Sequence, residues 1–432
     1  MRIAVLILLC SMPVILSADP PRPSSYSSSL TAADHYRAAI VAYQNGDSKQ
    51  LAIDAKAALA KRPGSPQLVY LNAVAEVANG NLESSLDYLS VLADQGLVIS
   101  PDREPAFSDY KSDLRFAALT QQFQNNNEPL GQASVRASLP DKEFIPEGIA
   151  VDGESSDLYL GSIRQQKIIV IDQLQQTRRF ADSGSSALLS AFGMRLDKPR
   201  QRLLVATSGV REAAEISSQK LGRAGILSFD LKTGKQLGQW WLPDDPDGHV
   251  LGDLVVTAAG IVFTSDSIGG GIYQLHTGSG RFSSLVQPGR FVSPQGVALT
   301  KDEKGLYIAA YRGGLYYLDI ESKRLDEIDY SATTTHGIDG LYRSGGSLIA
   351  IQNGQRPHRV VQFKLSESGR GIIGHQVLAS NLEQFDEPTL GALDKDKFHY
   401  IANSHWPAFD AEGNLSDADL TGPLVLTIPV SD

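Results

Sequence analysis

The residues best suited to chemistry in this chain occupy one place in a phrase that recurs six times. Three copies read Pro-Glu147-Gly-Ile-Ala-Val-Asp, Pro-Gln295-Gly-Val-Ala-Leu-Thr and Ile-Asp339-Gly-Leu-Tyr. The variable position holds two carboxylates and one carboxamide, all of which present oxygen atoms. If the repeats bring Glu147 and Asp339 to one axis, the two carboxylates repel each other, and a retained proton or a shared cation relieves that repulsion. Function should therefore be sought where these side chains converge.

The other copies of the phrase start at Phe192, Gly252 and Thr389. The segments between the copies read as short β-strands separated by turns rich in Gly and Asp, for example at residues 167–171. An all-strand repeat with a period of roughly 40 to 60 residues predicts a six-bladed β-propeller over residues 132–432. In such a fold the first residue of each inner strand faces a central channel, so the six positions should form a ring.

The last repeat is one strand short. Residues 423–428 leave no room for a fourth strand, whereas residues 133–138, before the first phrase, resemble the outer strand at 237–242. We predict that residues 133–138 complete the sixth blade and close the ring without an open sheet edge.

Residues 31–124 have a helical pattern that contains an internal repeat. One shift along the chain places Tyr36 on Tyr70 and the turn Asn45-Gly-Asp on Asn79-Gly-Asn. The repeat resembles the tetratricopeptide unit, which has a period of about 34 residues, and two unrelated helical hairpins of equal length are the alternative. The Gly of each turn supplies a positive φ. This helical domain is also a candidate surface for a protein partner.

Residues 1–18 read as a secretory signal peptide, and residues 19–30 as a tether rich in Pro and Ser. Ser11 and Pro13 interrupt the apolar stretch, which is shorter than the roughly 20 residues that a membrane span needs; an uncleaved anchor is the alternative. The only cysteine, Cys10, lies in this leader, so processing leaves no thiol for a disulfide or a metal site. We expect secretion, into a bacterial periplasm, with no membrane span after cleavage.

The composition narrows the class of protein. Hydrophobic residues make up 42% of the chain and charged residues 20%, as in a soluble globular protein. The formal net charge of −10 argues against binding to nucleic acid. No P-loop, dinucleotide fingerprint or His-Glu-x-x-His motif occurs in the sequence.

The phrase around Glu147, followed four repeats later by the one around Asp339, resembles the gluconolactonase/regucalcin family of six-bladed propellers. Members of that family hold a divalent cation, usually calcium, on the axis and hydrolyse lactones or phosphoesters. The resemblance places Glu147 at the family's metal-binding glutamate and Asp339 at its aspartate. Gln295 stands where an asparagine is usual. Gly252 stands at the other asparagine position, so Asp253 has to turn inward if that ligand is to be replaced.

The resemblance thus implies that Glu147, Asp253, Gln295 and Asp339 bind Ca²⁺ or another divalent cation. Calcium takes roughly six to eight oxygen ligands from carboxylates, amide carbonyls and water, which suits this set. A solvated polar channel without a metal is the alternative.

Three further residues are candidates for catalysis. Asp266 and His405 fall at strand ends that face the same mouth of the channel, and His336 lies three residues before Asp339. A His near the cation can act as a general base, while the cation polarises a carbonyl group. A hydrogen-bonded or surface position is the alternative for each His.

These observations lead to two expectations for function. The first is a metal-dependent hydrolase that acts on a lactone or ester as its small-molecule substrate. The second is a non-catalytic scaffold for protein–protein or ligand binding. The departure at Gly252 favours it, because a propeller that has lost an enzymatic activity also loses metal-ligand residues.

Overall fold

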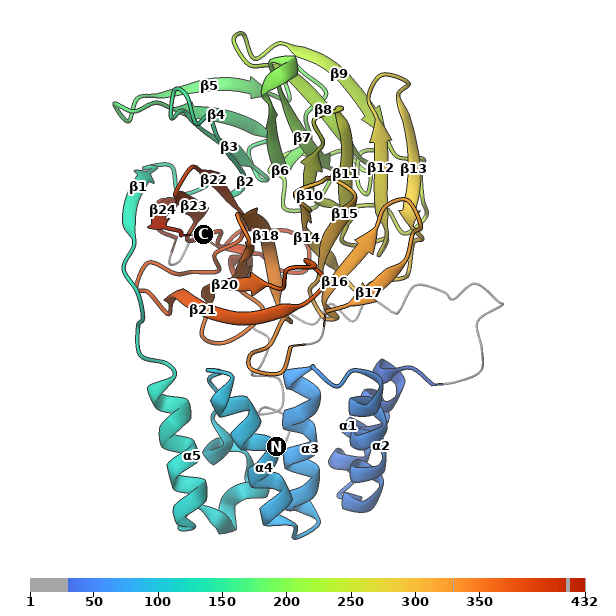
Figure 1. Ribbon diagram of the computed structural model, residues 1–432, viewed down its shortest axis with the longest axis vertical. Helices are drawn as coiled ribbons and strands as arrows, with labels where there is room; N and C mark the ends of the chain where they lie inside the picture. The colour runs from blue at the N-terminus through green and yellow to red at the C-terminus, as the bar shows by residue number, and fades with distance from the viewer. Residues whose placement is uncertain (1–29, 329, 417–419, 432) are drawn as a thin grey trace.

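The computed structural model describes residues 30–328, 330–416 and 420–431 (Figure 1). The predicted signal peptide at 1–18 lies outside these residues, as does the predicted tether at 19–30 except for its last residue. The described residues form an N-terminal helical region followed by a mainly β region (Figure 1).

The helical region contains two hairpins of matching length. Its elements are α1 (Ala32–Gln44), α2 (Ser48–Lys61), α3 (Pro66–Ala78), α4 (Leu82–Asp94), the short 3-10 helices η1 (Pro101–Arg103) and η2 (Pro105–Tyr110), and α5 (Leu114–Asn125). The step from the start of α1 to that of α3 equals the step from α2 to α4, and it is the repeat seen in the sequence. Gly46 and Gly80 have φ values of 74° and 80°, as the turns require. None of the described helices is both long and apolar enough to cross a membrane.

Small residues let these helices approach closely. Ala39 in α1 and Ala55 and Ala58 in α2 are fully buried in one cluster. Beyond the second hairpin, the Phe107 and Phe116 rings stack with centroids 5.2 Å apart and close the end of the helical core.

The β region is a six-bladed propeller made of six four-stranded antiparallel sheets, as predicted. From the inner to the outer strand, the blades are β2 (Pro146–Val151), β3 (Leu158–Ser162), β4 (Lys167–Ile171), β5 (Thr177–Asp182); β6 (Ser190–Asp197), β7 (Arg202–Ser208), β8 (Ala224–Asp230), β9 (Gln236–Trp241); β10 (Leu251–Val256), β11 (Ile261–Asp266), β12 (Ile272–His276), β13 (Arg281–Val286); β14 (Pro294–Leu299), β15 (Gly305–Ala310), β16 (Gly314–Asp319), β17 (Leu325–Glu327); β18 (Ile338–Ser344), β19 (Ser347–Gln352), β20 (Arg359–Leu365), β21 (Ile372–Ser380); and β22 (Gly391–Asp394), β23 (Lys397–Ile401), β24 (Leu424–Pro429), β1 (Ser134–Ser138).

The sixth blade closes the ring. Strand β1 pairs with β24, with Ser134 opposite Thr427 and Ser138 opposite Leu424. The strand that precedes the first blade is therefore the outer strand of the last one, which confirms the predicted closure. The third strand of this blade, β24, is thus covered by β1 and does not form the outer edge of the sheet.

The glycine of the repeated phrase is explained by the contact between neighbouring blades. A Cβ atom on Gly148 would lie 2.2 Å from the Phe192 carbonyl oxygen, and one on Gly296 would lie 2.5 Å from the Asp339 carbonyl oxygen. The backbone of the next inner strand occupies the space that a side chain needs. In blade 3 this position is held by Asp253, whose side chain is fully buried.

The helical region packs on the propeller face where the inner strands begin, next to blades 4 and 5 (Figure 1). Arg359 of β20 is the main polar link. Its guanidinium donates to the Gln95 carbonyl oxygen at the end of α4 (3.0 Å), to Thr333 Oγ1 (3.0 Å) and to Gln352 Oε1 (2.8 Å). Burial lowers the pKa of Arg359 to about 10, which leaves it protonated at neutral pH. A buried cation thus joins the two regions through neutral oxygen atoms.

Candidate functional site

The strand register places the six variable residues of the phrase around the mouth of the channel. In blades 3, 4 and 5 the variable residue follows directly after the first paired residue of the inner strand, inside a register shift. The six positions are Glu147, Phe192, Gly252, Gln295, Asp339 and Thr389. Because blade 6 lies between blades 5 and 1, Thr389 lies between the two carboxylates.

A group of buried carboxyl groups occupies this part of the mouth. We call Glu147, Asp339 and Glu387 the carboxyl cluster; all three are buried. Trp406 Nε1 donates a hydrogen bond to Glu147 Oε2 at 2.9 Å, and Asn353 Nδ2 donates one to Asp339 Oδ2 at 2.7 Å. These bonds hold two of the carboxyl groups in place from the loops after β23 and β19.

Burial makes ionisation of the cluster unfavourable. It raises the pKa of Glu147 well above its usual range, and the charge of Asp339 adds to this effect. Burial also raises the pKa of Asp339 to about 7, although the bond from Asn353 opposes the shift. For Glu387, burial and the charge of Asp339 raise the pKa to about 8. At neutral pH the cluster therefore retains protons unless a positive charge enters.

Two more oxygen atoms border the cluster, and both side chains are buried. Asn353 Oδ1 has no hydrogen-bond partner among the residues that the structure describes, whereas the Thr389 hydroxyl interacts with Glu147 and opposes the rise of its pKa. In the same part of the chain, no three His, Cys, Asp or Glu side chains are arranged to hold a metal ion. A cation at the mouth would thus depend on amide and hydroxyl oxygens together with Glu147 and Asp339. An oxygen-only donor set of this kind is what calcium prefers.

The other two predicted ligands have partners of their own. Asp253 Oδ2 lies 2.9 Å from Arg195 Nη2, and Asp253 Oδ1 accepts the backbone N–H of Leu254. The Arg195 guanidinium comes from β6 and lies over the ring of Tyr342 in β18, 4.9 Å from its centroid. Because β6 and β18 belong to opposite blades, Arg195 crosses the channel. Asp253 balances the charge of this buried arginine.

Gln295 fills the space that the glycine at 252 leaves. A Cβ atom on Gly252 would lie 3.0 Å from Gln295 Oε1. That oxygen accepts a hydrogen bond from Ser267, and Gln295 Nε2 donates to Ser293, both at 3.0 Å. Of the four predicted ligands, the structure thus brings Glu147 and Asp339 into the carboxyl cluster and gives the other two separate polar partners.

Asp266, a candidate for catalysis, forms a buried pair with His249. The His249 Nδ1 atom lies 2.6 Å from Asp266 Oδ2, and Nε2 lies 3.2 Å from the Pro243 carbonyl oxygen. The bond to Asp266 raises the pKa of His249, which favours an imidazolium that donates from both nitrogens. Asp266 also accepts the backbone N–H of Gly269. This pair fastens the loops at the rim of blade 3.

The two candidate histidines lie in different surroundings. His405 is buried next to Trp406, with Nδ1 2.8 Å from Asp386 Oδ2 and Nε2 3.1 Å from the Thr421 carbonyl oxygen. His405 thereby positions the loop that delivers Trp406 to Glu147. His336 instead lines a cavity between the helical region and blade 4, so the structure does not bring it to the carboxyl cluster.

Sequence reasoning did not assign Glu387 or Arg195 to the channel. Glu387 directly precedes Pro388, the counterpart of the prolines at 146 and 294, and this spacing is a signal that places it beside the ring. Arg195 stands where two other copies of the phrase have Ala150 and Ala298 and the copy around Asp339 has Tyr342. A charged residue at a position that is otherwise uncharged is a signal for a partner in the channel.

No protein-family profile matches the chain, and no curated protein matches it. Solved structures of similar fold include the PQQ-bound aldose sugar dehydrogenase of Streptomyces coelicolor, with 15% identity and a TM-score of 0.46 over 70% of this chain and 100% of that one. They also include a gluconolactonase of Xanthomonas campestris, with 16% identity and a TM-score of 0.45 over 70% of this chain and 91% of that one. The calcium-binding protein regucalcin of Agrobacterium tumefaciens has 13% identity and a TM-score of 0.46 over 68% of this chain and 93% of that one. None of these likenesses assigns a function to this chain.

Proposed function

We propose that the protein is a secreted, calcium-dependent hydrolase that acts on a lactone or ester at the mouth of the propeller channel. The observation that carries the proposal is the carboxyl cluster, whose three buried acids have raised pKa values and lie beside the Thr389 hydroxyl and Asn353 Oδ1, which has no partner among the described residues. Ionisable groups with perturbed pKa values in a cleft are typical of functional sites.

The residues suited to hold the cation are Glu147, Asp339, Asn353 and Thr389. When bound there, calcium would polarise the carbonyl group of the substrate. Without a cation Glu387 retains its proton at neutral pH, because its pKa is about 8. A cation bound beside it would lower that pKa, and the Glu387 carboxylate could then take the proton that water loses as it attacks. Trp406 keeps the Glu147 carboxylate oriented through its N–H donor.

Calcium and chelator titrations of the full chain test this proposal. A ligand that binds only the folded state stabilises it by about 2.7 kcal/mol at a hundredfold excess over Kd, so calcium should raise the melting temperature and chelator should reverse the effect. Glu147→Gln and Asp339→Asn should each lose most of the calcium response and any hydrolysis of lactone or ester substrates. Asp396→Asn, in the exposed turn between β22 and β23, is the matched control and should behave like the wild type.

Two results would overturn the proposal. One is a wild-type melting curve that responds to neither calcium nor chelator, with no metal found on the purified protein. The other is hydrolysis that survives both substitutions in the carboxyl cluster.

A non-catalytic scaffold is the second candidate. Its supporting observation is that Asp253 and Gln295 already have partners within the chain. In that case the helical region would bind a protein partner, and the propeller would serve as a rigid support. Purified protein that binds no calcium but retains a specific partner through α1–α4 would favour this role.

The proposed secretion rests on the predicted leader at residues 1–18. N-terminal sequencing of the exported protein should return a residue close to Ala18. A membrane-bound product that begins at Met1 would contradict secretion without affecting the proposed site.

A further inference from the structure

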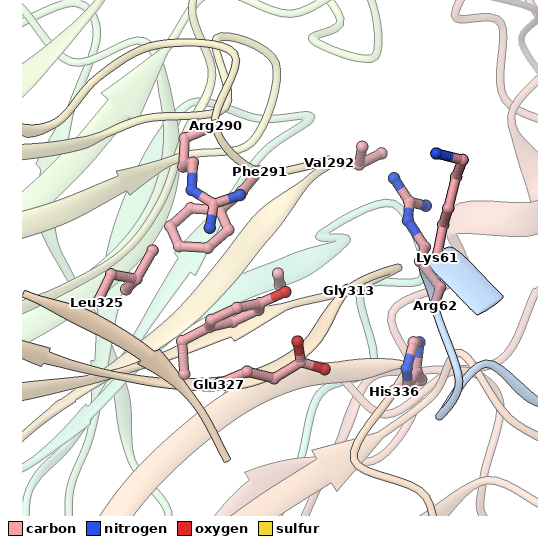
Figure 2. A pocket seen from close by; sticks show the side chains of 11 residues that line it. Lys61, Arg62, Arg290, Phe291, Val292, Gly313, Leu325, Glu327 and His336 are labelled. Atoms are coloured by element: carbon pink, nitrogen blue, oxygen red, sulfur yellow. The ribbon is translucent and has the colours of Figure 1, made fainter. Parts of the chain in front are cut away.

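A cavity of about 260 Å³ lies between the end of α2 and blade 4 (Figure 2). The helical region contributes Lys61 and Arg62 to its lining. The propeller contributes Arg290 from the loop after β13 and His336 from the loop before β18. The cavity is built from different residues than the carboxyl cluster, so it is a separate site.

Unpaired positive charge converges on this cavity. Lys61, Arg62 and Arg290 form no ion pair with any residue that the structure describes. Figure 2 shows Arg290 on one side of the cavity and the two basic residues of the helical region on the other. Among the described residues of the lining, Glu327 is the one carboxylate, which leaves those residues with a net charge of about +2. In a chain whose formal net charge is −10, such a gathering of cations requires an explanation.

The rest of the lining suits an organic molecule. The Arg290 guanidinium lies 5.8 Å from the centroid of the Phe291 ring, and the Phe291 and Tyr316 rings are 5.0 Å apart. These rings and Leu325 offer apolar surface beside the charges. Burial and the charge of Arg62 lower the pKa of His336 to about 4, so at neutral pH His336 is a hydrogen-bonding group without charge.

We propose that this cavity binds a small organic dianion, either a phosphate monoester or a dicarboxylate, between the helical region and the propeller. The charge of such a ligand balances the net charge of the lining, and Arg is suited to grip a phosphate or carboxylate with two parallel hydrogen bonds. Because Arg62 and Arg290 belong to different regions of the chain, the ligand holds the helical region against blade 4. Its binding therefore strengthens the docking that Arg359 provides at blade 5.

Titration of the full chain with three dianions tests the proposal. Inorganic phosphate, phenyl phosphate and succinate are added at constant ionic strength, and binding is followed by calorimetry and by melting temperature. At least one should bind saturably and raise the melting temperature. Arg62→Gln and Arg290→Gln should each weaken that binding at least tenfold. Arg178→Gln removes an exposed arginine of β5 and is the matched control, with unchanged binding.

A third variant separates a binding role from a structural one. Glu327→Gln removes the carboxylate of the lining and should tighten the binding several-fold, a gain that a misfolded protein does not show. Preference for phenyl phosphate over succinate would identify a phosphate ester as the ligand, and the reverse a dicarboxylate. Absence of saturable binding by all three compounds, or equal binding by the wild type and both arginine variants, would overturn the proposal.

Discussion

Replacing Asp339 by Asn should stabilise the protein when no divalent cation is present, and the gain should grow as the pH rises. Burial raises the pKa of Asp339 from 3.8 to about 7. Between these values the unfolded chain has released the proton, whereas the folded protein has kept it. The folded state thus binds more protons than the unfolded state, and stability falls as the pH rises through this range.

The size of the effect follows from the shift. At about 1.36 kcal/mol per pKa unit, the Asp339 carboxyl group lowers the free energy of unfolding by about 2 kcal/mol at pH 5 and about 4 kcal/mol at pH 8. Asn removes this term and keeps an oxygen that can accept the bond from Asn353 Nδ2. Since 1 kcal/mol moves the melting temperature of a large domain by about 2 °C, the gain should be about 4 °C at pH 5 and about 8 °C at pH 8.

Thermal unfolding in chelator at several pH values between 5 and 8 measures this difference, with Asp396→Asn as the control that should match the wild type. With calcium at a hundredfold excess over Kd, the advantage of Asp339→Asn should shrink by about 2.7 kcal/mol, because the wild type gains stability and Asp339→Asn does not. A gain that is the same at pH 5 and pH 8, or a loss of stability at pH 8, would refute the reasoning that the buried carboxyl group retains its proton.

Further expectations concern the packing of the propeller. Arg195→Ala should lower the free energy of unfolding by about 3–5 kcal/mol because it leaves a buried charge unpaired, and adding Asp253→Gly, which restores the usual phrase, should recover most of the loss in chemical denaturation. Arg359→Met should cost about 3 kcal/mol because three oxygen acceptors lose their donor, and limited proteolysis should then cut faster between α5 and β1. Deleting residues 133–138 should expose an edge of blade 6 and cause aggregation, visible in size-exclusion chromatography, whereas a chain that starts near Glu128 should remain monodisperse.

The propeller was predictable from the sequence because similar packing between neighbouring blades requires similar residues in each repeat. Four of the six inner strands have a glycine where the next blade's backbone approaches, as at Gly148 and Gly296, so the phrase recurs as blades begin. The closure by β1 was predictable for a related reason, since the last repeat lacked a strand and an unused one preceded the first.

The candidate site was less accessible to such reasoning. Glu147 and Asp339 occupy the same position of the phrase, and the structure brings both to one cluster. Arg195 and Asp253 each depart from the phrase, in neighbouring blades, and their opposite charges pair with each other. Comparing each copy with the common pattern reveals the two departures but not that they form a pair. His336 is close to Asp339 in sequence, but the backbone turns at Gly337, with a φ of 71°, and His336 lines another cavity.

The closing pair of strands also sets an order for events on the ribosome. Strand β1 leaves the ribosome before any blade is made, whereas its partner β24 emerges after all the other strands, with Ser134 finally opposite Thr427. At a synthesis rate of about 5–20 residues per second, this delay is roughly 15–60 s. During that time the first five blades are synthesised, but the strands that join the first blade to the last are not. Helices α1–α5 are also complete, whereas the surface of blade 5 on which they dock is synthesised late. Any factor that shields nascent chains should therefore be engaged by this protein until β24 emerges.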